Sequence, residues 1–469
     1  ESWRARVWAR PRPPDRCQMS DRGADTIAAV ATAPGRGAVG ILRLSGPQAF
    51  TVATSLCGTL PPPRQAALRV FRDELGQRCD QGLVLCFAAP HSYTGEDVVE
   101  LQGHGGPAVL DLLLRSACAH GARIARPGEF SERAFLNDKL DLAQAEAVAD
   151  LIDAHSRAAV LAANRSLEGE FSRRIGTLAA QLLDLRVFVE GALDFSDEDI
   201  DWLSEPQLAE SMELASPALD LLLSRAGQGR RLREGMVIAI AGRPNVGKST
   251  LLNRLAGSDA AIVSDVPGTT RDTLREHLVL DGLPLTVIDT AGLRQTDDPV
   301  EAEGVRRAWQ TLEQAELILF IADDRSGLTS EDLALLAQLP PAREVLRVFN
   351  KCDLSGNPDG IVENSEHRAL RISAAQGAGL DALCRELHAA AGLLDAGEGL
   401  FSARARHLDA LQQTRLHLHD ARIRLYARQA VELAAEDLRL AHDALGTITG
   451  RVDSEHLLGA VFSRFCIGK

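Results

Sequence analysis

Several features that would identify other protein classes are missing from this chain. No uninterrupted apolar run approaches the ~20 residues needed to cross a bilayer, so we expect no membrane association. The 8 cysteines form no C-x-x-C pair, which disfavours zinc and iron–sulfur sites and indicates reduced thiols in the cytoplasm. Cationic residues are in deficit, and the net charge of -14 disfavours indiscriminate nucleic-acid binding while leaving room for a local basic patch.

The 469 residues are enough for roughly two to four domains with separate cores. Residues 1–20 are rich in Arg, Pro and Trp and lack an apolar signal core, so we interpret them as a disordered extension or a translation artefact. Residues 25–125 mix turns with strand-like runs at 40–45 and 82–87 and a helical run at 111–120, which predicts an α+β domain.

An Ala- and Leu-rich region follows from about Asn137. Asn137 or Asp138 is expected to cap its first helix. A second helical region is predicted from about Arg404 to Leu445, packed on the first. One face of a long amphipathic helix is predicted by the spacing of Phe171, Ile175, Leu178, Leu182, Leu185 and Val189, and a similar face in the second region by Leu411, Leu418 and Leu425.

Residues 236–390 change to alternating strands and helices. Short apolar runs at 236–240, 285–288, 317–321 and 345–349 are separated by helical patterns, which is typical of a mostly parallel sheet. Because helical patterns flank this segment on both sides, we predict an α/β domain inserted within one helical domain.

The inserted segment opens with a phosphate-binding motif. Residues 242–249 match G-x-x-x-x-G-K-S after a predicted strand and before a predicted helix. Backbone N–H groups of such a loop bind phosphates at a helix N-terminus. Lys248 is expected to contact the β- and γ-phosphates and Ser249 to ligate Mg²⁺.

The nucleotide base is indicated by Asn350-Lys351-Cys352-Asp353. A carboxylate at Asp353 can accept hydrogen bonds from guanine N1–H and the 2-amino group, and adenine offers neither donor. Asp289-Thr-Ala-Gly292 and Ser373-Ala374 occur in the expected order around it. The sequence therefore predicts a GTPase.

The expected switch segments depart from those of Ras-like enzymes. Thr269 and Thr270 are candidate switch threonines, one of which would complete the Mg²⁺ shell. Leu293 follows Gly292, where Ras-like enzymes carry the Gln that orients water. Hydrolysis must then use another group to position water and another positive charge. The downstream acids Asp297, Asp298 and Glu301 could position the water, although their sequence context alone favours solvated loop residues.

Over nearly its whole length from Asp25 the chain resembles the MnmE (TrmE) family of tRNA uridine-modifying GTPases. The resemblance rests on the G-domain motifs, on residues 126–140 (RPGEFSERAFLNDKL) and on the terminal Phe465-Cys-Ile-Gly-Lys469. It implies a multidomain α+β, all-α and α/β fold. The implied domains are an N-terminal folate-binding and dimerisation domain at 21–138, a discontinuous helical domain at 139–232 and 395–469, and an inserted Ras-like P-loop G domain at 233–394.

The resemblance also implies cofactors and partners. These are Mg²⁺, K⁺ in place of an arginine finger, and a tetrahydrofolate derivative in the 5,10-methylene or 5-formyl form. The implied assembly is a cytoplasmic homodimer that acts with an FAD-containing MnmG-type subunit, as a heterotetramer, on tRNA. The implied reaction is (carboxymethyl)aminomethylation at C5 of the wobble uridine.

Site residues carried over by motif position complete these expectations. The resemblance implies catalytic roles for Glu301, Lys248 and Thr270. It implies that Ser249 and Thr270 ligate Mg²⁺. It implies that K⁺ is ligated by Asn245, Ser264, Val266 and Thr269. Folate contacts fall on Arg43, Glu100, Lys139 and Lys469, while Cys466 is open to a structural or a chemical role. The GTP-binding set is Asn245, Val246, Gly247, Lys248, Ser249, Thr250, Ser264, Thr269, Thr270, Asp289, Gly292, Asn350, Lys351, Asp353, Ser373 and Ala374.

Other interpretations use some of the same motifs. An Era-like ribosome-assembly GTPase shares the G domain but predicts a basic RNA-binding C-terminus, which this helical C-terminus lacks. A dynamin-like membrane GTPase lacks support because no apolar tip or lipid-binding basic stretch is present. His104 is expected to be a turn or core-contact residue rather than a base. The cluster Arg225, Arg230, Arg231 and Arg233 is compatible with tRNA contact or with a solvated linker.

Overall fold

The computed structural model describes residues 25–194, 206–257, 275–289, 312–362, 367–393, 399–427 and 430–451, with Val461, Phe465 and Gly468. They form two compact units, divided at Glu146/Ala147 and again at Arg451/Val452. In this part of the chain, no helix is both long enough and apolar enough to span a bilayer. The cysteines in the described part are all free thiols.

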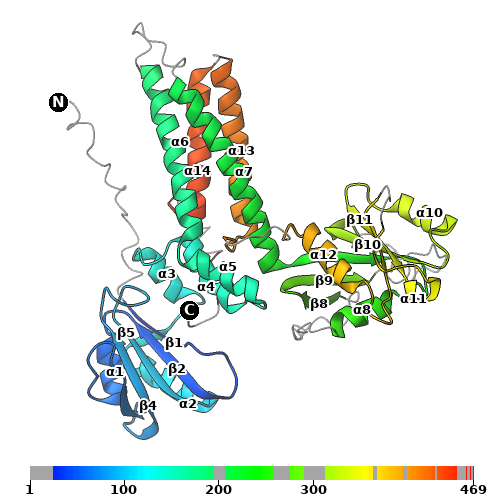
Figure 1. Ribbon diagram of the computed structural model, residues 1–469. Coiled ribbons are helices and arrows are strands. Elements are labelled where there is room, and N and C mark those ends of the chain that lie inside the picture. The colour runs from blue at the N-terminus through cyan, green and yellow to red at the C-terminus, as the bar shows by residue number, and fades with distance from the viewer. Residues whose placement is uncertain are drawn as a thin grey trace, which may run out of the picture. The chain divides into compact units, whose positions relative to one another are not determined.

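The first unit is built on a 6-stranded sheet in the order β3-β4-β5-β2-β1-β6 (Figure 1). All neighbouring strands are antiparallel except β1 and β6. Its elements are β1 (Thr26–Val30), β2 (Gly37–Ser45), α1 (Ala49–Cys57), β3 (Ala67–Arg72), β4 (Arg78–Phe87), β5 (Val98–Gly105), α2 (Pro107–Ala119), β6 (Ala122–Ile124), α3 (Glu129–Leu136) and the start of α4 (Leu142–Ile152). The predicted α+β character and its two strands are confirmed.

The two faces of this sheet differ in what covers them. Leu42, Leu44 and Leu101 are buried in the core that the sheet forms with α1 and α2. Since side chains alternate along a strand, the neighbouring positions Arg43 and Glu100 lie on the other face. Two expected folate contacts, Arg43 and Glu100, therefore lie on the face away from α1 and α2.

Charged side chains are buried in α3, within the 126–140 block. The Glu129 side chain is 2% exposed and ion-pairs with Arg123 and Arg133. Burial would raise the pKa of Glu129, but hydrogen bonds from Arg123 and from the Arg126 backbone N–H lower it to about 2. The charged residues of the 126–140 block can thus be buried because they form an ion-pair network. Removing one partner would leave a buried charge uncompensated.

The second unit contains a bundle of four long helices, α6, α7, α13 and α14, that run alongside one another (Figure 1). All six predicted face positions of α6 are at most 2% exposed, which confirms the amphipathic helix. Leu411, Leu418 and Leu425 are buried as well. The helices of this part are α5 (Arg157–Leu167), α6 (Glu170–Asp194), α7 (Pro206–Glu234), α13 (Ala405–Tyr426) and α14 (Val431–Thr449).

The predicted helical region after Arg404 is present as two helices, α13 and α14, and Ala430 before α14 has a left-handed φ of 54°. The helix-starting cap expected at Asn137 is wrong. Asn137 follows the end of α3 as its C-cap and does not begin a helix. α4 starts later, where the Asp141 carboxylate accepts a hydrogen bond from the Gln144 backbone N–H at 2.9 Å.

The inserted α/β domain has a 7-stranded sheet in the order β12-β13-β11-β10-β7-β9-β8. Only the β8–β9 and β12–β13 pairs are antiparallel within the described sheet, as expected for a mostly parallel sheet. Helices α8 and α12 pack on one face and α10 on the other (Figure 1). The elements are β7 (Met236–Ala241), α8 (Lys248–Gly257), β8 (Arg275–Leu280), β9 (Leu283–Asp289), β10 (Leu317–Asp323), α10 (Ser330–Gln338), β11 (Glu344–Asn350), α11 (Cys352–Ser355), β12 (Gly360–Ile361), β13 (Ala369–Ile372) and α12 (Leu380–Ala390).

Candidate nucleotide site and a second site in the N-terminal unit

The nucleotide motifs meet at the carboxyl ends of the parallel strands. The phosphate loop follows β7, Asp323 ends β10 and Asn350 ends β11. β10 and β11 are paired in register, with Asp323 opposite Asn350. Ligands of open α/β sheets bind at this edge, so the strand order alone brings together motifs that are a hundred residues apart.

The phosphate loop has the backbone shape that its glycines permit. Gly242 has φ +140°, and a Cβ there would lie 2.3 Å from the Ile321 carbonyl oxygen. Gly247 has φ +100°, and a Cβ there would lie 2.2 Å from Asn350 Nδ2. Both positions therefore exclude larger residues. α8 begins at Lys248, so the loop ends at a helix N-terminus, as phosphate binding requires.

Lys248 is the first residue of α8, and its side chain turns back over the loop. Its Nζ donates to the carbonyl oxygens of Gly242 at 2.7 Å and Arg243 at 2.9 Å. The ammonium group is thus held above the loop by exchangeable backbone contacts. A bound phosphate can replace either of them because Lys presents three rotatable donors.

Asn350 joins the phosphate loop to the base-binding loops. It is 2% exposed. Its Nδ2 donates to the Val246 carbonyl at 2.8 Å, and its Oδ1 accepts from the Ala374 backbone N–H at 2.9 Å. One amide therefore holds three predicted motifs in position.

Lys351 and Asp353 frame the base side of the site. Lys351 has φ +69°, and its Nζ donates to the Asn245 carbonyl at 2.7 Å and to Asp323 Oδ2 at 2.9 Å. Asp353 lies in α11 and is exposed, which leaves its carboxylate accessible to a base. Ser373 is fully buried and its backbone pairs with Ala378.

Two acids that sequence reasoning missed organise this side of the site. Hydrogen bonds from Arg325, and then from Lys351, hold the pKa of Asp323 well below its ordinary range. Asp324 accepts from Arg371 Nε at 3.0 Å and from Asn357 Nδ2 at 2.8 Å. The available signal was their position at the end of a buried apolar run, with Asp323 ending β10 and Asp324 following it.

Several predicted site residues lie outside the described residues. These are Ser264, Val266, Thr269, Thr270, Gly292, Glu301, Cys466 and Lys469, and the side chain of Asp289 is outside as well, as are Leu293, Asp297 and Asp298. The residues brought together are Asn245, Val246, Gly247, Lys248, Ser249, Thr250, Asn350, Lys351, Asp353, Ser373 and Ala374. The hydroxyl of Ser249, at the start of α8, fits the hard oxygen donors that Mg²⁺ prefers.

The N-terminal unit brings two expected folate residues together. Arg43 Nε donates to Glu100 Oε1 at 3.0 Å across paired strands. The same guanidinium lies 5.7 Å from the Tyr93 ring centroid, and its Nη1 donates to the Gly468 carbonyl at 3.4 Å. The C-terminal segment therefore reaches this side of the sheet at Gly468, one residue before Lys469.

Lys139 lies beside the same aromatic residue. Tyr93 and Lys139 line an open cavity of about 500 Å³ with Arg64, Leu85, Phe87, His91 and Ser92. Lys139 Nζ donates to the Pro90 carbonyl at 3.0 Å. Leu85 is the cross-strand neighbour of Glu100, so the cavity adjoins the Arg43–Glu100 pair. Aromatic, cationic and anionic groups together suit a flat heterocycle with a carboxylate tail.

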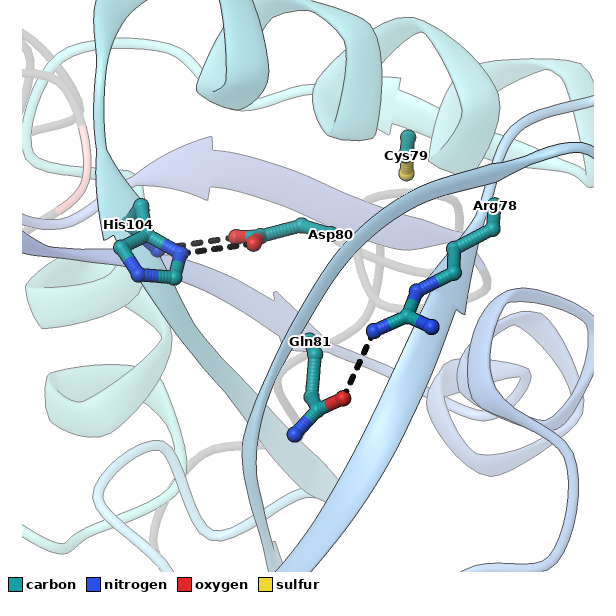
Figure 2. Close-up of a pocket in the computed structure, with 5 residues that line it drawn as sticks. All are labelled: Arg78, Cys79, Asp80, Gln81 and His104. Carbon is teal, nitrogen blue, oxygen red and sulfur yellow. Dashed lines mark hydrogen bonds and ion pairs between the residues drawn. The ribbon is translucent and has the colours of Figure 1, made fainter.

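A separate cavity lies where β4 and β5 meet (Figure 2). His104 Nδ1 lies 2.7 Å from Asp80 Oδ1, and the His104 backbone N–H donates to Asp80 Oδ2 at 2.8 Å. Burial would raise the pKa of Asp80, but both hydrogen bonds from His104 hold it below its ordinary value. The His104 side chain is 75% exposed, so the expected core contact is wrong.

The described geometry defines a P-loop GTPase: a doubly covered, mostly parallel sheet with a phosphate loop and a guanine-type base loop at one edge. The profile described as MnmE helical domain matches residues 142–466, and that of GTP-binding protein TrmE N-terminus matches residues 26–139.

Full-length relatives agree with these matches. The chain is 53% identical over 457 residues to the tRNA modification GTPase MnmE of Nitrosococcus oceani, covering 97% of this chain and 99% of the relative. It is 53% identical to that of Sodalis glossinidius and 51% identical to that of Nitrosomonas europaea, each covering 95% of this chain and 99% of the relative. The chain belongs to the MnmE family and is a GTPase that uses Mg²⁺.

Proposed function

We propose that this GTPase drives a folate-dependent modification at C5 of the wobble uridine of certain tRNAs. The single observation that carries the proposal is the second site, where Arg43, Glu100 and the C-terminal Gly468 meet beside the cavity of Tyr93 and Lys139. A switch without substrate chemistry, such as an Era-like GTPase, has no use for such a site. Relatives over nearly the whole chain are named tRNA modification GTPases, which supports the substrate class.

The proposed chemistry needs a one-carbon donor and an electron carrier. A tetrahydrofolate derivative in the 5,10-methylene or 5-formyl form would supply the carbon unit. Arg43, Lys139 and Lys469 offer cationic donors to it, and Glu100 offers an acceptor for pterin N–H groups. FAD would be carried by a partner subunit of the MnmG type.

Folate binding is expected to depend on Arg43. Replacing Arg43 with Ala removes a charged donor, so the Kd for 5-formyltetrahydrofolate should rise by about tenfold or more in calorimetry, since a hydrogen bond to a charged group contributes about 1.5–3 kcal/mol. The matched control is Arg115→Ala, which removes an exposed arginine of α2 that pairs with Asp111. Equal affinity of the Arg43→Ala and native proteins would contradict the assignment.

We propose that K⁺ supplies the positive charge that an arginine finger supplies elsewhere. Asn245 supports this role, since it has φ +63° in the phosphate loop and is exposed. Its side chain makes no hydrogen bond within the described part of the chain, which leaves its amide oxygen available to a cation. Ser264, Val266 and Thr269 are the other proposed ligands, with Glu301 positioning water and Thr270 completing the Mg²⁺ shell.

GTP hydrolysis should therefore be faster in K⁺ than in Na⁺ at equal ionic strength, by at least about tenfold, because a fixed cation stabilises charge that develops in the transition state. Single-turnover rates in KCl and NaCl measure this directly. Asn245→Ala should reduce the ratio of the two rates. Equal rates in both salts would remove K⁺ from the mechanism.

The proposed assembly is a homodimer formed through the N-terminal units, joined by the FAD-containing subunit in a heterotetramer. The sheet face away from α1 and α2 supports the homodimer because it exposes apolar side chains, with Leu68 58% and Leu83 42% exposed. Covering such a face with a second copy would remove apolar surface from water. Cys466 keeps two proposed roles, one structural and one in the modification chemistry.

A further inference from the structure

The chain enters the G domain through a short, stiff connection. α7 ends at Glu234 and β7 begins at Met236, so Gly235 is the only residue between them. Gly235 has φ +78°, and a Cβ there would lie 2.6 Å from the Pro284 carbonyl oxygen. β7 leads directly into the phosphate loop. The last turn of α7 is thus separated from the nucleotide site by a single strand.

The chain returns from the G domain through a buried segment, residues 400–403. Phe401 is fully buried and stacks on Phe171 of α6 at a centroid distance of 4.5 Å. The Ser402 backbone N–H donates to the Ala162 carbonyl at 3.2 Å. Gly229 of α7 allows the close approach, because a Cβ there would lie 1.9 Å from the Phe401 carbonyl oxygen. The return segment is therefore packed among α5, α6 and α7.

One carboxylate accepts hydrogen bonds from both connections, the one that enters the G domain and the one that returns from it. Asp150 in α4 has a side chain that is 5% exposed. Its Oδ1 accepts from Arg233 Nε, in the last turn of α7, and from Arg404 Nη2, at the start of α13, at 2.7 Å each. Its Oδ2 accepts from Ser402 Oγ at 2.5 Å. The inserted domain thus begins and ends beside a single buried acid.

We propose that Asp150 is a positioning residue that couples the nucleotide state of the G domain to the helical bundle. Arg233 precedes the strand that carries the phosphate loop, and Arg404 opens the helix to which the chain returns. While both guanidinium groups share one carboxylate, the two connections stay together, and a change at one is transmitted to the other. The last step, from the bundle to tRNA chemistry, rests on the proposed function.

The electrostatics of the cluster explain why it is sensitive to Asp150. The Arg404 side chain is only 12% exposed and that of Arg233 31% exposed. Two guanidinium groups bonded to one oxygen repel each other once the carboxylate is neutralised, and a buried charge left unpaired is unfavourable. Neutral Asn at position 150 should therefore separate the two connections while leaving the hydrogen-bonded G-domain sheet intact.

Hydrogen exchange on the full-length protein tests the coupling without any tRNA. In the native protein, exchanging GDP for a non-hydrolysable GTP analogue should change exchange rates both in residues 236–257 and in α5 with residues 399–404. In Asp150→Asn the G-domain response should remain, while the response of α5 and residues 399–404 falls by at least about fivefold, the scale of a typical coupling free energy. Arg233→Gln should act in the same direction and carries the test if Asp150→Asn does not fold.

The matched control is Asp437→Asn. Asp437 is 7% exposed and pairs with Arg424 and His417 inside the α13–α14 hairpin, so it resembles Asp150 in burial but bonds neither connection. The control should keep the native response in both regions. A native response in Asp150→Asn, an equal loss in Asp437→Asn, or no response of the helices in the native protein would each overturn the proposal.

Modification measured per GTP hydrolysed gives the second readout. We expect Asp150→Asn to lower this ratio by about tenfold or more while GTP turnover stays within about twofold of native, since coupling and catalysis are separate free energies. Asp437→Asn should leave the ratio unchanged. If the native protein modifies no tRNA, the proposed function fails, and the exchange experiment still decides the role of Asp150.

Discussion

Replacing Lys248 with Ala is expected to lower single-turnover GTP hydrolysis by about 10²- to 10³-fold, the usual effect of removing one preorganised donor from a developing negative charge. In this structure Lys248 Nζ donates to two loop carbonyls, at 2.7 and 2.9 Å. Lys248 is only half-buried, so its loss removes little of the core packing. The thermal unfolding midpoint should stay close to the native value while the rate constant falls.

The control for Lys248 removes a cation from the opposite end of the same sheet. Arg368 pairs with Glu344, at the start of β11, and with Glu386. Arg368→Ala should leave hydrolysis within about twofold of native, because an exposed ion pair contributes little and is distant from the nucleotide. If Lys248→Ala and Arg368→Ala hydrolyse GTP equally well, the phosphate-loop assignment is wrong.

Asp353→Asn is expected to reverse the base preference. Asn can no longer accept two hydrogen bonds from guanine N1–H and the 2-amino group, which should weaken GTP binding by about 3–4 kcal/mol, a factor of about 10²–10³. The amide can instead donate to the 2-oxo group of xanthine. XTP should therefore bind the variant more tightly than GTP does, as measured by displacement of a fluorescent nucleotide.

A neighbouring acid supplies the control for this experiment. Asp359 is exposed and lies a few residues further along the same loop region. Asp359→Asn changes the net charge equally, so it should retain the native preference for GTP. Retention of GTP preference by Asp353→Asn would show that another group reads the base.

Much of the fold could be predicted because hydrophobic periodicity reports burial directly. The face of α6 from Phe171 to Val189 is buried as its spacing predicts, and the four apolar runs of the G domain all lie in strands. The break between α13 and α14 could not be predicted. Ala430 adopts a left-handed φ although Ala is a strong helix former, so helix propensity alone does not locate the break.

The site residues also differ in how far the sequence alone predicts them. Loop motifs can be recognised in the sequence, because Gly242 and Gly247 are needed for close backbone approach and their spacing is diagnostic. Residues that support these loops from elsewhere in the chain cannot be recognised in this way. Asp324 holds the base loop through Arg371 and Asn357, and Asp150 gathers Arg233 and Arg404 from positions 83 and 254 residues away. Such long-range pairs follow from topology, which a single sequence does not display.

We propose that GTP hydrolysis by this chain drives modification of the wobble uridine. The most direct measurement is mass spectrometry of wobble uridines from a strain that lacks the gene, supplied with either the native chain or Lys248→Ala. We expect unmodified uridine without the gene, full restoration by the native chain and none by Lys248→Ala. Restoration by Lys248→Ala to the native level, or modified uridine in the strain without the gene, would contradict it.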